Sequence, residues 1–413
     1  MAFAEILWML VSYTCIFLIS LLLAWTVYYD FTRTHIPAGM KEGGKLRAFN
    51  LIMNFSFGLG LFLEKLGVCS KIKFLRISFD GIPPMKDSKL LIKNMFFEHV
   101  PVRVYWPKTP SPAGNRRGLI YLHGGVGQIG SLRSYERVCR YLARESNSVV
   151  VNIGYRLSPE YRPPIQIQDC FTAIIYFLKN AKDYGVDPNS IVIGGDSSGA
   201  TLAAGICQDL VSRTDLPRPR AQILLYPFLQ ALDFSLPSYQ QNHSIPILFK
   251  KRAISLGLSY FYPKTDGVAG IMKNAHVPEK LRVKYKKWIS ADHVPDEFKV
   301  RGYVPAEPAP FSEELYQLCQ PGFQSKYSPL IAEDEIIRQV PEAYILTCEY
   351  DVVRDDGLLY KKRLEDNGVR VTWHHLKDGF HGIAFVIDYG PLQFQGTQIA
   401  MENVIHFLHG LSK

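Results

Sequence analysis

The sequence predicts an α/β fold, in which a mostly parallel sheet carries helices on both faces and an apolar helix precedes it. Three observations support this class: an uncharged N-terminal stretch, short β-branched runs that alternate with helical patterns from about residue 100, and an irregular segment that interrupts the alternation. Of the 413 residues, 47% are hydrophobic and 21% charged, which is typical of a packed core. The net charge of +9 comes without a block of five or six basic residues, so it favours a lipid surface over nucleic acid.

The first element is an apolar stretch from Ile6 to Tyr29 that contains no Asp, Glu, Lys, Arg or His. Its 24 residues reach about 36 Å as a helix, more than the ~30 Å of a hydrocarbon core. The stretch is longer than the core of a signal peptide, and it has neither a basic segment before it nor an A-x-A site after it. We therefore expect a retained single-pass anchor over residues 1–30, with a cleaved signal peptide as the alternative.

The flanks of this stretch and two sequons point to opposite sides of the membrane. Four basic residues lie between the stretch and residue 47, so the positive-inside rule places the body in the cytosol. Asn54 and Asn242 begin N-x-S sequons, which are used only in the lumen. Asn242 lies farther from the anchor and is the better glycosylation candidate of the two. Composition leaves the orientation open.

Residues 31–99 are interpreted as a membrane-proximal lid segment. The stretch from Phe49 to Val68 is apolar, but asparagines, glycines and the Glu64-Lys65 pair interrupt it. This pattern indicates an amphipathic helix that lies on the membrane or lines a pocket, rather than a second span.

The alternating part of the chain is predicted to form the core in two pieces, residues 100–229 and 326–413. Strands are expected at Val100–Trp106, Gly118–Leu122, Val149–Ile153, Ser190–Gly194, Ala221–Tyr226, Ala343–Cys348 and Val369–His375. Helices are expected at Ser131–Ser146, Ile167–Tyr184, Gly199–Arg213, Gly357–Asn367 and from about Gln395 to Leu411. Residues 230–325 contain helices, prolines and irregular polar stretches, and are interpreted as a lid insertion.

The sharpest chemical signal is the segment GDSSG at residues 195–199, which fits G-x-S-x-G. It lies between a predicted strand and a predicted helix, as a nucleophile elbow requires. The elbow presents the Ser197 hydroxyl near a helix N-terminus, which favours developing negative charge. The alternative is a Gly/Ser-rich turn without chemistry.

A nucleophilic serine needs a base that an acid holds in place. Asp351 directly follows a predicted strand, and His381 lies in the DGFHG loop after the last one. The order Ser, Asp, His is that of α/β-hydrolases. We therefore predict an α/β-hydrolase fold with Ser197, Asp351 and His381 as catalytic triad. Asp355 and Asp356 are better explained as acidic residues at a helix N-terminus.

The oxyanion hole is expected in the loop His123-Gly124-Gly125 after an early strand. Backbone N–H groups of Gly124 and Gly125, with that of Ser198 from the elbow, are the predicted donors. Val126 replaces the usual third glycine, and its β-branched side chain puts the loop geometry in doubt. This substitution keeps a second hypothesis open, a catalytically weak or inactive hydrolase-fold protein that binds lipid or another partner.

A dinucleotide-binding pattern, G-x-G-x-x-G at residues 125–130, lacks the acidic residue that should end the second strand. The histidines and cysteines show no metal-ligand spacing. We expect neither a cofactor nor a metal.

Taken together, these motifs resemble the arylacetamide deacetylase family in the hormone-sensitive-lipase group of α/β-hydrolases. The resemblance runs over nearly the whole chain and includes YLHGG, GDSSG and DGFHG in this order. It implies a type II membrane protein of the endoplasmic reticulum with a lumenal catalytic body. It also implies Ser197, Asp351 and His381 as triad of a serine esterase or deacetylase. From the anchor and the Phe-, Leu- and Tyr-rich lid we expect an apolar small-molecule or lipid ester as substrate.

Overall fold

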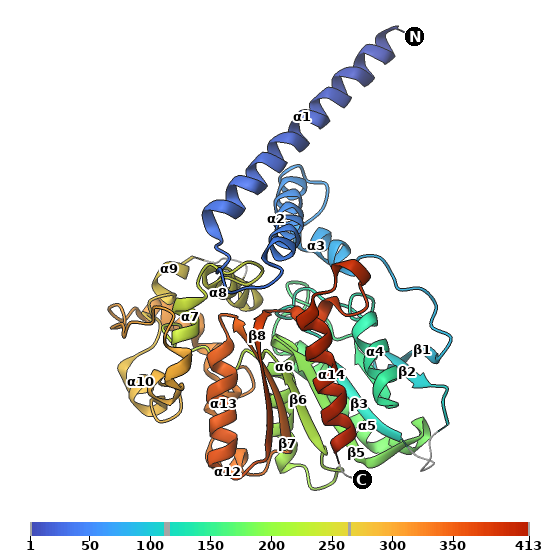
Figure 1. Cartoon of the computed structure of the whole chain (residues 1–413), viewed down its shortest axis with the longest axis vertical. Coiled ribbons are helices and arrows are strands. Elements are labelled where there is room, and N and C mark those ends of the chain that lie inside the picture. Colours follow the sequence, from blue (N-terminus) through green and yellow to red (C-terminus); the bar gives the residue numbers. More distant parts are fainter. Residues whose placement is uncertain (1, 111–115, 263–265, 412–413) are drawn as a thin grey trace.

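An eight-stranded sheet forms the centre of the protein in the computed structural model, which describes residues 2–110, 116–262 and 266–411 (Figure 1). The strand order is β1-β2-β4-β3-β5-β6-β7-β8. The strands are β1 Leu90–Phe97, β2 Val100–Pro107, β3 Arg116–Leu122, β4 Val149–Ile153, β5 Val186–Asp196, β6 Ala221–Leu225, β7 Glu342–Tyr350 and β8 Val371–Phe380. The β1-β2 and β2-β4 pairs are antiparallel, and all pairs from β4 to β8 are parallel. The predicted α/β-hydrolase fold is confirmed.

Helices cover both faces of the sheet, so the central parallel strands are buried on both sides. β4 and β6 are buried along their whole length. One face packs against α5 Ile165–Asn180, α6 Ser198–Asp209 and α13 Arg354–Asp366. The other face packs against α4 Glu136–Ser146 and α14 Gln395–Gly410. The two apolar cores hold the carboxyl ends of the parallel strands at one edge, where the candidate site lies.

All seven predicted strands are present, with ends that differ by a few residues. An eighth strand, β1, lies inside the segment 31–99 and pairs with β2 at the sheet edge, where its half-exposed pattern gave no clear strand signal. The helix predicted from Ser131 begins at Glu136, because the Ser131 hydroxyl accepts from the backbone N–H of Arg133 and Ser134 and closes a turn first.

Three helices precede the sheet: α1 Ala2–Arg33, α2 Gly43–Lys65 and α3 Lys71–Asp80. α1 projects away from the body (Figure 1). α2 and α3 form a helical hairpin beside the end of α1 that joins the body. The side chains of α1 are largely exposed over its apolar length. By length and composition, both α1 and α2 are candidates for crossing a membrane.

The insertion between β6 and β7 contains short helices joined by irregular chain. They are α7 Pro237–Gln241, α8 Lys250–Phe261, α9 Val268–Ile271, α10 Glu279–Tyr285, α11 Glu313–Cys319 and α12 Asp334–Ile337. Short 3-10 helices lie at Ala181–Tyr184, Leu210–Ser212, Ala291–His293, Asp296–Phe298, Gln320–Phe323, Pro329–Ile331, Ile383–Val386 and Gly390–Leu392. Apolar side chains of α8 and α9 join the core on the α6 side of the sheet, so the insertion is packed onto the platform.

Candidate active site

The turn between β5 and α6 places Ser197 at the carboxyl edge of the sheet. Ser197 has φ 53° and ψ −125°, a conformation that is strained for a residue with a side chain. The flanking glycines are required by space, since a Cβ at Gly195 or Gly199 would lie 2.4 or 2.1 Å from the carbonyl oxygen of Leu122. The segment therefore has the strand–tight turn–helix geometry of a nucleophile elbow.

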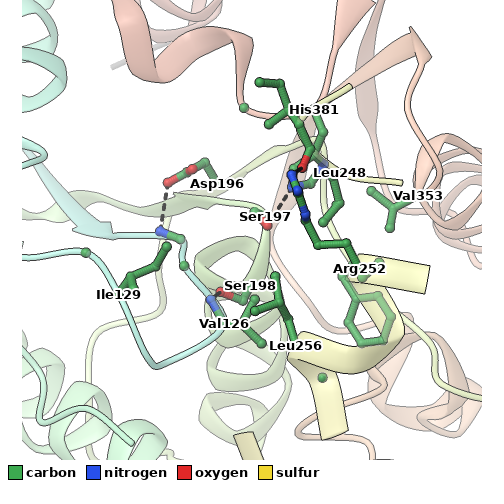
Figure 2. Close-up of a pocket in the computed structure, with 18 of the residues that line it drawn as sticks. Val126, Ile129, Asp196, Ser197, Ser198, Leu248, Arg252, Leu256, Val353 and His381 are labelled. Atoms are coloured by element: carbon green, nitrogen blue, oxygen red, sulfur yellow. Dashed lines mark hydrogen bonds between the residues drawn. The ribbon is translucent and has the colours of Figure 1, made fainter. Parts of the chain in front are cut away.

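Ser197, His381 and Asp351 form one chain of hydrogen bonds, and Figure 2 shows the step between Ser197 and His381. The Ser197 Oγ lies 2.8 Å from His381 Nε2, and His381 Nδ1 lies 2.8 Å from Asp351 Oδ2. Asp351 follows β7 directly and is fully buried, and His381 follows β8 directly and is largely buried. The structure thus brings together three residues that are far apart in the sequence and that the motifs selected.

The Asp351 loop is held by a buried asparagine that the sequence analysis treated as a sequon. Asn242 Nδ2 donates to the carbonyl oxygens of Asp351 at 2.8 Å and Glu349 at 3.0 Å. The Asp351 Oδ1 accepts from the backbone N–H of Val353 at 3.0 Å. Asn242 therefore fixes the backbone of Asp351, while the Val353 amide orients the Asp351 carboxylate.

This burial contradicts both glycosylation candidates. Asn242 is fully buried with its amide nitrogen in two hydrogen bonds, so a glycan on that nitrogen is incompatible with the fold. Asn54 is also buried, and its amide nitrogen donates to Asp30 Oδ1 at 3.2 Å. The sequon pattern records only three residue types, whereas the use of a sequon requires an exposed amide.

The oxyanion loop differs from the sequence prediction at Gly124. Its N–H donates to Asp196 Oδ1 at 3.0 Å and is therefore not free to donate to an oxyanion. Within the described residues, the N–H groups of Gly125 and Ser198 have no hydrogen-bond acceptor. The N–H of Val126 donates to Ser198 Oγ at 2.8 Å (Figure 2). Two of the three predicted donors, at Gly125 and Ser198, are thus unpaired, and the third is occupied.

Backbone conformation explains how the loop accommodates Val126. Val126 has φ 56°, in the left-handed region that favours glycine, so the chain keeps the bend at the cost of strain in a β-branched residue. Gly125 has φ 104°, and a Cβ there would lie 2.3 Å from the carbonyl oxygen of Ile129. His123 supports the loop from below: its Nδ1 donates to the carbonyl oxygen of Gly124 at 2.8 Å, and burial lowers its pKa to about 4.

Asp196 links the nucleophile strand to the oxyanion loop, and sequence reasoning gave it no role. Its carboxylate accepts from the hydroxyls of Tyr121 at 3.1 Å and Tyr135 at 2.9 Å, besides the N–H of Gly124. Burial raises its pKa to about 6, against the lowering effect of these donors. Asp196 and Tyr121 lie inside the GDSSG and YLHGG motifs, but Tyr135 carries no motif signal.

A cavity of about 410 Å³ opens over Ser197 and is lined mainly by apolar side chains. One wall comes from the hairpin and the other from the insertion; they include Phe49, Met53, Phe57 and Phe79 on the first and Phe234, Ile254, Leu258, Phe261, Ile271 and Leu318 on the second. α2 therefore lines a pocket, which is one of the two roles predicted for its amphipathic sequence. The apolar lining suits an apolar molecule.

A half-buried arginine joins the two walls. Arg252, on α8, lines the cavity and donates to the carbonyl oxygen of Ile247 at 2.8 Å and to Asn54 Oδ1 at 2.5 Å. Its guanidinium also lies over the rings of Phe57 and Phe249, and burial lowers its pKa to about 10. Sequence reasoning missed Arg252, because a single basic residue in a lid helix carries no signal.

Comparison with known proteins agrees with this geometry. A family model described as the alpha/beta hydrolase fold matches residues 119–274 and 305–385. Human arylacetamide deacetylase-like 4 is 44% identical, over 94% of this chain and 95% of the relative. Rabbit (Oryctolagus cuniculus) arylacetamide deacetylase is 40% identical, over 86% and 90%. A thermostable esterase from Pseudomonas putida is 21% identical with a TM-score of 0.65, over 92% and 100%, which supports the fold alone.

Proposed function

The chain belongs to the arylacetamide deacetylase family of α/β-hydrolases, and from this premise we propose that it is a membrane-anchored serine hydrolase of apolar carboxylic esters. The observation that carries the proposal is the hydrogen-bond chain from Ser197 Oγ through His381 to Asp351, with 2.8 Å at each step. Ser197 and His381 line an apolar cavity of about 410 Å³.

In the proposed reaction, His381 Nε2 accepts the Ser197 proton while Oγ bonds to the ester carbonyl carbon. Asp351 keeps the proton-bearing Nδ1 of His381 in place and stabilises the imidazolium that forms. The unpaired N–H groups of Gly125 and Ser198 are the proposed donors to the tetrahedral oxyanion. His381 then gives its proton to the leaving alcohol, and a water molecule releases the acid from the acyl-enzyme by the same steps. An amide passes through the same acyl-enzyme, so aryl-acetamides fit this chemistry too.

Labelling with a fluorophosphonate tests the nucleophile. The full chain should be labelled, Ser197→Ala should lose the label, and Ser198→Ala should keep it as the matched control. A folded wild type that stays unlabelled, or label that survives Ser197→Ala, contradicts the proposal.

The substrate is proposed to carry a small or medium apolar acyl group, because both cavity walls are apolar. Rates on p-nitrophenyl esters of increasing acyl length measure this preference. A higher rate on charged, water-soluble esters than on neutral ones of equal size would contradict it.

We propose that the protein lies in the endoplasmic reticulum membrane as a type II protein with a lumenal body. The exposed apolar α1 and the family resemblance support this placement, and the buried sequons do not add to it. In sealed microsomes, added protease should spare the body until detergent is added. Complete digestion without detergent assigns the body to the cytosol.

A second candidate, a catalytically weak or inactive lipid-binding protein, draws on Val126. The loop is one donor short because the Gly124 N–H is bonded to Asp196. Val126 does not replace this donor, since its backbone is strained and its N–H is paired with Ser198 Oγ. Under this hypothesis Val126→Gly raises esterase activity strongly from a near-zero start. A substantial wild-type rate that Val126→Gly leaves unchanged excludes it.

A further inference from the structure

The relative direction of α1 and α2 follows from two contacts. Near the end of α1, Asp30 accepts from Asn54 of α2 at 3.2 Å. Farther back along α1, a Cβ at Gly58 of α2 would lie 2.9 Å from Leu22 and 2.8 Å from Trp25. Because residue numbers fall along α1 as they rise along α2, the two helices are antiparallel. α2 therefore runs toward the N-terminus of α1.

This direction sets the height of the hairpin along the apolar stretch of α1. Gly58 faces Leu22 and Trp25, which lie inside the uncharged stretch that ends at Tyr29. From Gly58 to its end at Lys65, α2 continues for about 10 Å at ~1.5 Å per residue. The far end of the hairpin thus lies beside residues of α1 that a bilayer would surround.

The side chains at this end are apolar and exposed. We call Leu61, Leu66 and Val68 the hairpin tip; their exposed fractions are 41%, 60% and 68%. Lys65, Lys71 and Lys73 stand among them, and such long basic side chains reach headgroup phosphates while their stems stay apolar. A cluster of this kind is typical of an interfacial helix whose apolar face enters a leaflet by about 5–10 Å.

The same hairpin forms a wall of the cavity. Phe49, Met53 and Phe57 of α2 and Phe79 of α3 line it. Ile52 lines it as well, yet its side chain is 63% exposed, so Ile52 lies at the mouth. The mouth therefore opens along the helix pair that reaches the membrane.

We propose that the hairpin tip inserts into the leaflet through which α1 enters, and that apolar esters pass from this leaflet into the cavity along α2. The inference rests on the proposed anchor and hydrolase, and it adds a second membrane contact and a route for the substrate. Burial of the tip in lipid removes exposed apolar surface that lies beside an established apolar helix.

Depth-dependent fluorescence quenching tests the insertion without use of activity. The full chain, with Cys15, Cys69 and Cys319 replaced by Ser, carries an NBD label at Val68→Cys in phosphatidylcholine vesicles. Spin-labelled lipid should quench this probe about threefold more than the same label at Val283→Cys, on the exposed α10 far from α1, and iodide should do the opposite (Figure 1). In a second variant that keeps Cys15 and has no Val68→Cys, an NBD label at Cys15 reports whether α1 lies in the bilayer.

Three results overturn the insertion. The first is iodide quenching at Val68→Cys equal to that at Val283→Cys. The second is shielding of Val68→Cys from both quenchers, which assigns the tip to a protein contact such as a second copy. The third is iodide access to the label at Cys15, which shows that α1 is not an anchor.

The substrate route has its own test. The double variant Leu66→Glu/Val68→Glu should lower the rate on p-nitrophenyl decanoate dissolved in vesicles by about tenfold, and keep the rate on aqueous p-nitrophenyl acetate within about twofold. Val283→Glu should change neither rate. An unchanged decanoate rate overturns the route. A wild type that hydrolyses neither ester contradicts the hydrolase proposal instead, and the quenching result stands apart from it.

Discussion

The two sides of the Ser197 hydroxyl are held by different kinds of contact. On the base side, His381 and Asp351 meet through side-chain atoms, 2.8 Å at each step, and Asn242 fixes the Asp351 backbone from a buried position. On the oxyanion side, the donors are backbone N–H groups, and the loop that carries them is tied to a buried carboxylate, that of Asp196.

The difference matters because side-chain roles follow from residue type, whereas amide roles follow from the direction of each peptide plane. Gly124 has the residue type expected of an oxyanion donor, yet its N–H points to Asp196. Val126 has an unexpected type, yet its backbone adopts the left-handed bend. We expect the base side to respond to substitution by large losses of rate, and the oxyanion side by smaller changes of either sign.

The largest effect is expected on the base side, for Asp351→Asn. The amide keeps the size of the side chain but favours the wrong tautomer of His381, so kcat should fall by about 10⁴-fold with the protein folded. Steady-state kinetics together with circular dichroism measure both properties. A loss below tenfold assigns the acid to another residue.

The next effect concerns the carboxylate under the oxyanion loop. Burial raises the pKa of Asp196 to about 6, above its unfolded value near 3.8, so between pH 4 and 6 the folded chain holds a proton that the unfolded chain has lost. The contribution of Asp196 to stability therefore falls as pH rises through this window, by about 2–3 kcal/mol in total. Asp196→Asn lacks this pH-dependent contribution. In thermal unfolding from pH 4 to 7, the stability of the variant should therefore rise relative to that of the wild type. Parallel curves contradict the assignment.

Asn242→Ala tests the support of the acid loop. The carbonyl oxygens of Asp351 and Glu349 each lose one of two donors and keep the other, from the Arg354 N–H and the Arg301 guanidinium respectively. The two lost hydrogen bonds should cost about 2 kcal/mol of unfolding free energy and lower kcat more than they change KM. Ser244→Ala removes the same sequon but leaves Asn242 in place, and should change neither stability nor electrophoretic mobility. A mobility shift in Ser244→Ala would show that Asn242 carries a glycan and that its burial is wrong.

The smallest effect is expected for Ser198→Ala. Removal of the hydroxyl frees the N–H of Val126, which becomes available beside the proposed donors Gly125 and Ser198. One added weak donor should lower the barrier by about 1 kcal/mol, which raises kcat about fivefold. Kinetics on one short p-nitrophenyl ester are sufficient. A fall in rate instead shows that the Ser198 hydroxyl itself assists the reaction.

Local patterns in the sequence were sufficient for the anchor-like helix, the alternating core and the order Ser197, Asp351, His381. Each is encoded by neighbouring residues: an uncharged run long enough for a bilayer, β-branched runs between helical periods, and motifs at the carboxyl ends of strands. In a parallel sheet those strand ends share one edge, so the motifs meet whatever the rest of the chain does. The edge strand β1 was not predicted, because it is half exposed and carries no motif.

Only the tertiary structure decided which amides are free and which asparagines are buried. The direction of the Gly124 N–H depends on Asp196, 72 residues away, and the burial of Asn242 depends on carbonyls more than 100 residues away. Arg252 and Tyr135 reach the site through packing partners on other elements. A hydrogen bond or a buried surface belongs to a pair of segments, and its free energy depends on both. The sequence of one segment therefore determines what its residues are able to do, and the packed neighbours determine which of those roles they perform.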